Sequence, residues 1–240
     1  MLRAIIFDFD GIIVDTEPTI YRVFLELAAK EGFTLSEEEY FCDYLALHDR
    51  GVLNLLFSRN GGKLTDARLE ELLEWKNKRY MKVIQDGLPP LPGALDFIEQ
   101  VSRDYPLAIA TGSIRSEVSH LLGKIGLTKK FPVLVSADDF GPSKPDPACF
   151  LLTLEQLRRQ PNFSPDTLQA TECLVIEDSP AGIAGAGAAG MRSLGLAHSV
   201  PLEALGVADA DWRAENYAAI DWNEIVAGFS EKHRRAGEGD

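Results

Sequence analysis

The stretch LRAIIF at residues 2–7 runs directly into DFDG at residues 8–11. A continuous apolar run is typical of a strand that is buried on both faces of a parallel sheet. Residues two apart on an extended chain share a face, so the carboxylates of Asp8 and Asp10 point into the same crevice. One carboxylate can attack phosphorus while the other moves a proton, which indicates covalent phosphoryl transfer. Taken alone, DFDG is equally compatible with a simple turn at Asp10-Gly11.

Further apolar runs predict three more strands. These runs lie at residues 107–110 (LAIA), 133–135 (VLV) and 173–176 (CLVI). Helix-like segments alternate with the strands, near residues 93–103, 114–125, 146–159 and 180–190. The alternation predicts an α/β fold with a doubly wound, parallel, Rossmann-like sheet, whose ligands bind beyond the carboxyl ends of the strands. Beyond residue 195 the pattern is irregular, and we expect a short strand near 207–213 and a helix near 222–229.

The interval between the first two strands is far longer than a strand-to-helix connection needs. Its amphipathic segments, with no convincing strand among them, predict a small all-helical cap domain at residues 17–87, inserted after the first strand and lying over its carboxyl end. Thr16 can cap the first helix of this insertion. Residues 1–16 and 88–230 then form the catalytic core, and the charged residues 231–240 form a flexible tail.

Composition argues against several classes of partner. The 240 residues include 24 Lys and Arg against 37 Asp and Glu, a formal net charge of −13, which repels nucleic-acid phosphates and anionic lipid. No stretch approaches the roughly 20 apolar residues of a membrane span. We therefore expect neither nucleic acid nor membrane as a partner, and a monomer, with a dimer as the alternative. Three widely spaced cysteines fit a reducing compartment, so we expect a cytoplasmic protein.

Two motifs at strand ends suit an anionic substrate. Thr111-Gly112-Ser113 follows the second strand and offers hydroxyl and backbone N–H donors to phosphate oxygens. The alternative is a plain helix N-cap at Ser113. Lys144 lies in SKPDP at residues 143–147, where prolines stiffen the backbone, so it can hold an anionic nucleophile and a phosphate together. The alternative is a solvated surface lysine.

Glu177-Asp178 follows the fourth apolar run and precedes a helix. With Asp8, these two carboxylates supply the oxygen ligands that Mg²⁺ prefers, so we expect Mg²⁺ as the cofactor. The alternative is that Asp178 or Ser179 caps the helix, a role that can coexist with metal binding. We attribute the many Gly and Ala residues of that helix to close packing.

Together, these four motifs resemble those of the haloacid dehalogenase superfamily, in the branch of small sugar phosphatases and beta-phosphoglucomutase. The resemblance runs from about residue 2 to about residue 195. It implies that Asp8 becomes an aspartyl-phosphate and that Asp10 is the general acid and base, with its backbone carbonyl on Mg²⁺. It also implies that Asp178 is a metal ligand, and that Glu177 binds the metal directly or through water.

The same resemblance assigns Thr111 and Lys144 to the phosphoryl oxygens and the cap to substrate choice. Lys76 in WKNK (residues 75–78) resembles a cap lysine of the family that reaches the substrate. The alternative is a solvated residue on a charged helix face. His48 and Arg50 fall near the family's specificity loop.

We therefore expect a Mg²⁺-dependent phosphatase that hydrolyses a small phosphorylated metabolite, a sugar phosphate or a phosphoglycolate-like compound, through an aspartyl-phosphate. A phosphomutase is the alternative, but mutases like beta-phosphoglucomutase carry a histidine early in the first cap helix, and residues 17–21 (EPTIY) contain none. A dehalogenase would leave Asp10 and the metal ligands without a role. A catalytically silent binding module is disfavoured because every motif residue is present.

Overall fold

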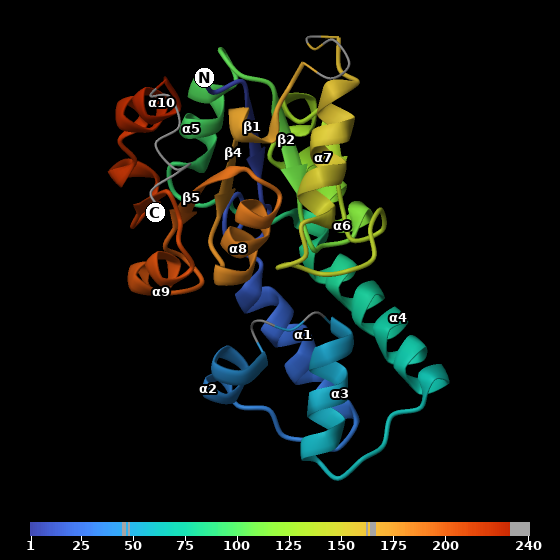
Figure 1. Cartoon of the computed structure of the whole chain (residues 1–240). Coiled ribbons are helices and arrows are strands. Elements are labelled where there is room, and N and C mark those ends of the chain that lie inside the picture. The colour runs from blue at the N-terminus through green and yellow to red at the C-terminus, as the bar shows by residue number, and fades with distance from the viewer. Residues whose placement is uncertain (45–46, 48, 162, 164–166, 231–240) are drawn as a thin grey trace. The chain divides into compact units, whose positions relative to one another are not determined.

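The computed structural model describes residues 1–44, 47, 49–161, 163 and 167–230, so the predicted tail at 231–240 lies outside the described residues. The chain divides into two compact units. The α/β unit comprises Met1–Val14 and Pro89–Asp240, and the helical unit comprises Asp15–Leu88 (Figure 1). Each unit is described by itself below.

The described residues of the α/β unit form a six-stranded, all-parallel sheet of order β3-β2-β1-β4-β5-β6. The strands are β1 (Ala4–Phe7), β2 (Leu107–Ala110), β3 (Val133–Val135), β4 (Cys173–Glu177), β5 (Arg192–Leu196) and β6 (Trp212–Ala214). All residues of β1, β2 and β4 are buried, which explains why their sequences are apolar without alternation. The predicted doubly wound parallel sheet is confirmed.

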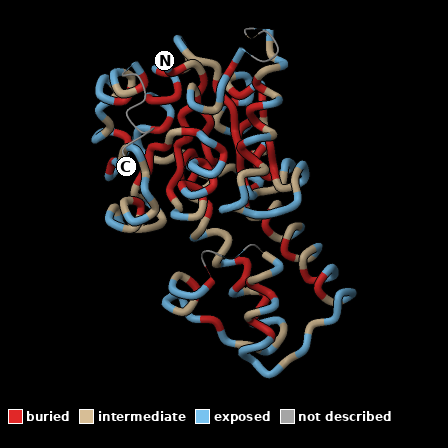
Figure 2. Tube along the Cα trace, viewed as in Figure 1, coloured by how far each residue is buried: buried red, intermediate tan, exposed pale blue. Residues whose placement is uncertain are grey.

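Helices cover the sheet on both faces. They are α5 (Ala94–Val101), α6 (Arg115–Lys124), α7 (Ala148–Arg158), α8 (Pro180–Ala188), α9 (Leu202–Val207) and α10 (Trp222–Ser230). Neighbouring residues of β1 show the two faces: Ile6 belongs to the core cluster that contains Phe150 of α7, whereas the ring of Phe7 lies 6.4 Å from that of Phe97 in α5. Figure 2 shows buried residues running along the strands between these helices. The sheet is therefore a rigid support for whatever lies at its carboxyl edge.

The region beyond residue 190 differs from the sequence-based prediction. The chain forms β5 and α9 before β6, whereas the sequence analysis predicted a single strand near 207–213. Ser193 and Gly195 interrupt the apolar run of β5 and hide it. Gly195 suits this close packing, because a Cβ there would lie 3.1 Å from Cβ of Leu205 in α9, tighter than most contacts, and Leu205 would have to shift slightly.

The helical unit is built from α1 (Glu17–Lys30), α2 (Glu37–Glu39) with a π-helical turn at Tyr40–Tyr44, α3 (Asp49–Arg59) and α4 (Asp66–Val83). Apolar residues of these helices form a separate core, and its largest side chains include Phe24, Tyr40 and Tyr44. Thr16 precedes α1, but its side chain makes no capping hydrogen bond, so this prediction was wrong. Among the described residues, none of the helices combines the length and apolarity that crossing a bilayer requires.

Candidate functional site

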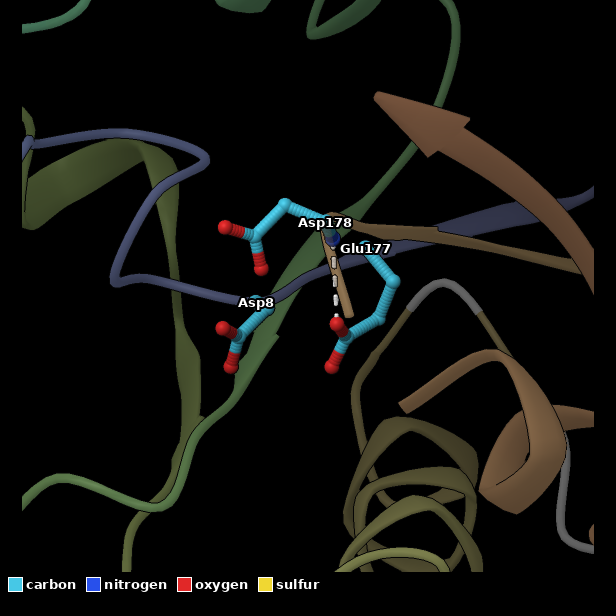
Figure 3. A group of neighbouring side chains, drawn as sticks. All are labelled: Asp8, Glu177 and Asp178. Carbon is cyan, nitrogen blue, oxygen red and sulfur yellow. Dashed lines mark hydrogen bonds between the residues drawn. The ribbon is translucent and has the colours of Figure 1, made fainter. Parts of the chain in front are cut away.

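The carboxyl ends of β1 and β4 bring three buried carboxylates together (Figure 3). Asp8 follows β1, Glu177 ends β4 and Asp178 follows it. Oxygen atoms from the three side chains all lie within 4.8 Å of one another. The two strands are neighbours where the strand order reverses, and open α/β sheets hold their ligands at that point. The structure thus gathers the side chains that the sequence analysis assigned to a metal.

Lys144 reaches into this cluster. Its Nζ lies 2.8 Å from Oδ1 of Asp8, 2.5 Å from Oε1 of Glu177 and 3.2 Å from the carbonyl oxygen of Ala110. It also lies 5.2 Å from the centre of the Phe150 ring, within cation–π range. Burial alone lowers the pKa of Lys144, but the charges of Asp8 and Glu177 outweigh it and raise the pKa. The Lys144 side chain is therefore a cation that is only 13 % exposed and is paired with two carboxylates, so the solvated alternative is wrong.

The cluster holds more negative charge than the Lys144 ammonium can offset. Burial raises the pKa of Asp8 well above its ordinary value, against the opposing charge of Lys144. Burial, and after it the charge of Glu177, raises the pKa of Asp178 to about 7. Buried carboxylates that repel one another in this way are stabilised by a cation. An all-oxygen set of ligands is what Mg²⁺ takes, so the residues present fit that metal.

Glu177 is held from both ends of its carboxylate. Lys144 donates to Oε1, and Oε2 accepts from the Ser179 hydroxyl at 2.9 Å and from the backbone N–H groups of Asp178 and Ser179 at 3.1 Å. The Ser179 hydroxyl in turn accepts from the backbone N–H of Gly182 and so caps α8. The capping and cluster roles therefore coexist, as the sequence analysis allowed.

Gly182 leaves room for the Glu177 carboxylate, because a Cβ at this position would lie 1.9 Å from Cδ of Glu177. Ala normally stabilises a helix interior by about 1 kcal/mol relative to Gly. We expect Gly182→Ala to lower the free energy of unfolding instead, because the Glu177 side chain must move. The matched control is Gly187→Ala in the same helix, where a Cβ meets no atom within 4 Å of the described structure and should stabilise. Urea denaturation of both variants measures this difference in sign, and stabilisation by both would contradict it.

Asp10 is bound by the motif at the end of β2. Its Oδ2 accepts hydrogen bonds from Oγ1 of Thr111 at 3.2 Å and from Oγ of Ser113 at 2.6 Å. The backbone N–H of Ser113 donates to Oγ1 of Thr111. A Cβ at Gly112 would meet no atom of the described structure within 4 Å, so the backbone there is open to a ligand. The hydroxyls of Thr111 and Ser113, which were expected to bind phosphate, thus both contact Asp10, the predicted general acid and base.

Two contacts of Asp178 could not be inferred from the motifs. Ser199, in the loop after β5, donates a hydrogen bond to Oδ2 of Asp178. Gly11 has φ +68°, and a Cβ there would lie 1.9 Å from that same oxygen. The one sequence signal for a role of Ser199 is its position just beyond the carboxyl end of β5. Because the sequence analysis did not predict β5, it also missed Ser199.

The predicted substrate residues of the helical unit differ in their surroundings. The Lys76 side chain is 4 % exposed, and its Nζ lies 2.8 Å from Oδ2 of Asp49, so the solvated alternative is wrong. Arg50 is exposed and forms an ion pair with Glu70. His48 lies outside the described residues. All of these contacts lie within the helical unit.

Comparison with known proteins adds a family and relatives. The family model described as haloacid dehalogenase-like hydrolase matches residues 5–196. A phosphorylated carbohydrates phosphatase of Thermotoga maritima is 30% identical over 200 residues, 83% of this chain and 87% of that protein. The fructose-1-phosphate phosphatase YqaB of Escherichia coli is 30% identical over 191 residues, 80% of this chain and 94% of that protein. The crystal structure of a beta-phosphoglucomutase from Clostridium difficile shares the fold, with a TM-score of 0.81 over 96% of this chain and 98% of that one at 24% identity.

Proposed function

The chain belongs to the haloacid dehalogenase-like hydrolases, and on that premise we propose that it is a Mg²⁺-dependent phosphatase of a small phosphorylated metabolite. The observation that carries the proposal is the buried cluster of Asp8, Glu177 and Asp178 around the Lys144 ammonium. A phosphorylated carbohydrate is the substrate class that the names of the phosphatases from Thermotoga maritima and Escherichia coli favour.

We propose that Asp8 attacks phosphorus while the bond to the leaving oxygen breaks and Asp10 gives that oxygen a proton. Asp10 then takes a proton from a water molecule that attacks the phosphorus of the aspartyl-phosphate. The bond between phosphorus and Asp8 breaks, inorganic phosphate leaves, and both carboxylates return to their starting states. The contacts of Asp10 with Thr111 and Ser113 support this assignment, because they orient a side chain that must act in both steps.

The remaining residues of the site manage charge. Asp8, Asp178 and the backbone carbonyl of Asp10 would hold Mg²⁺ directly, with Glu177 bound through water, and the ion would supply positive charge that offsets the negative charge of the nucleophile and the phosphate. We assign Glu177 to the metal through water, because both of its oxygens already accept hydrogen bonds. Lys144 forms an ion pair with Asp8, and we propose that its ammonium also attracts a phosphoryl oxygen of the substrate toward the nucleophile.

The test is Mg²⁺-dependent phosphate release from a panel of phosphorylated carbohydrates and phosphoglycolate. We expect release that stops when Mg²⁺ is removed with a chelator. Transfer of the phosphoryl group within a sugar, without phosphate release, would show a mutase instead. A protein that neither hydrolyses nor isomerises any compound would contradict an enzymatic role toward these classes.

We expect Mg²⁺ to stabilise the protein more at about pH 8 than at about pH 5.5. The pKa of Asp178 is raised to about 7 from an ordinary value of 3.8, so without metal the folded state binds the extra proton between these values. The stability of the metal-free protein therefore falls as the pH rises through this window. Mg²⁺ binds the ionised carboxylate and restores the lost stability. Thermal unfolding with and without Mg²⁺ at both pH values measures the difference. An equal shift at the two pH values would contradict it.

We further propose that Lys76 of the helical unit contributes to substrate choice. Lys76→Ala should change the order of preferred substrates across the panel more than the affinity for Mg²⁺. Asp49→Asn is the matched variant, because it keeps the Lys76 side chain and removes the charge that pairs with it. An unchanged substrate order in Lys76→Ala would leave Lys76 as a buried structural residue of the helical unit.

A further inference from the structure

The aspartates of the cluster each have one oxygen already engaged by the protein. Oδ1 of Asp8 accepts from Lys144, and Oδ2 of Asp178 accepts from the hydroxyl of Ser199. For Glu177 both oxygens are engaged, as described above. Figure 3 shows the three side chains turned toward one another, with the hydrogen bond from the Asp178 backbone to Glu177. Asp8 and Asp178 thus each offer a metal ion one carboxylate oxygen rather than both.

Oδ2 of Asp178 is enclosed as well as hydrogen-bonded. The Cβ position of Gly11 lies 1.9 Å from this oxygen and 2.9 Å from Oγ of Ser199, so the chain at Gly11 packs directly against both. Gly11 tolerates this approach and the positive φ of +68° because it has no side chain. The Asp178 carboxylate is therefore fixed in rotation, with Oδ1 as its remaining oxygen.

We propose that Ser199 is a positioning residue that restricts Asp178 to one ligating oxygen and thereby makes the site select Mg²⁺ over Ca²⁺. Mg²⁺ demands an octahedral shell at short distances, which single carboxylate oxygens supply. Ca²⁺ takes more ligands at longer distances and commonly binds both oxygens of a carboxylate. In Asp178 the Ser199 hydroxyl and the backbone at Gly11 hold one oxygen and leave the other for a metal. This arrangement suits Mg²⁺ and weakens the binding of Ca²⁺. This inference rests on the metal site of the proposed function.

The test is direct titration of the metal-free full chain with Mg²⁺ and with Ca²⁺ by isothermal calorimetry, without substrate. We expect Ser199→Ala to lower the ratio of Mg²⁺ to Ca²⁺ affinity by about tenfold, the effect of losing one hydrogen bond to a charged group. Ser199→Thr should keep the wild-type ratio, because its hydroxyl can donate the same bond. Val200→Ala, one residue further along the loop, is the control: it shortens a side chain that carries no hydroxyl and should also keep the wild-type ratio. Circular dichroism of each variant verifies that it is folded.

The outcomes separate this inference from the function on which it rests. A wild-type protein that binds Mg²⁺, with an unchanged Mg²⁺ to Ca²⁺ ratio in Ser199→Ala, overturns the role of Ser199 and leaves the metal site intact. A ratio that falls equally in Ser199→Ala and Ser199→Thr overturns it too, because the hydroxyl would not be the cause. A wild-type protein that binds neither ion overturns the metal site itself.

Discussion

Asp8→Asn should abolish turnover, with a loss of roughly 10⁴-fold or more, as expected when a group that forms the covalent bond is removed. The amide cannot attack phosphorus, whereas its size and its place beyond β1 are unchanged. The fold should survive, because Lys144 keeps its contacts with Glu177 and with the carbonyl oxygen of Ala110. Phosphate release under saturating Mg²⁺ measures the effect, and rapid acid quenching with labelled substrate shows whether labelled protein still forms.

Two further variants make this result specific to the nucleophile. Asp8→Ala guards against slow conversion of the new amide back to a carboxylate, which would restore a trace of activity. Asp10→Asn should also suppress turnover, but it leaves the nucleophile in place, so labelled protein can form from a substrate with a good leaving group and then persist. Full turnover by Asp8→Asn would refute the covalent mechanism while leaving the family and the fold untouched.

The central part of the site was predictable because it depends on local patterns and on one rule of topology. Apolar runs followed by acidic residues marked the carboxyl ends of β1 and β4, and parallel strands place such ends at one edge. The rule brought Asp8 and Glu177 together although the sequence separates them widely. Lys144 followed from the same reasoning, since its motif comes after β3.

The rest depended on approaches between segments that no local pattern encodes. Ser199 was missed because the polar and small residues of β5 conceal the strand that positions it. Gly182 was attributed to packing in general, whereas its specific neighbour is the Glu177 carboxylate. Lys76 lies in a charged stretch, but Asp49 and the ring of Tyr80 surround its ammonium within the helical unit. Burial of a charge is decided by its partners, which are remote in sequence.

Asp178→Asn should change activity and stability in opposite directions. The carboxylate is buried, and burial and the charge of Glu177 raise its pKa to about 7, so above that pH its ionised form destabilises the metal-free protein. The neutral amide removes this repulsion and can still accept the hydrogen bond from Ser199. We expect the metal-free variant to be more stable than the wild type at about pH 8, by an amount on the order of a few kcal/mol.

The same substitution should remove most of the affinity for Mg²⁺ and lower phosphate release by roughly 10³-fold or more, because a neutral amide is a much weaker partner for a hard cation. Urea denaturation without metal, calorimetric titration with Mg²⁺ and the phosphate assay measure the three quantities on one variant. The stability gain should shrink as the pH falls below about 7 and vanish only near pH 3.8, where the wild-type carboxyl is protonated in the unfolded chain as well as in the folded one. Loss of stability at pH 8 would show that Asp178 is a structural residue of the loop before α8. Gain of stability with intact Mg²⁺ binding would show that the cation is held elsewhere.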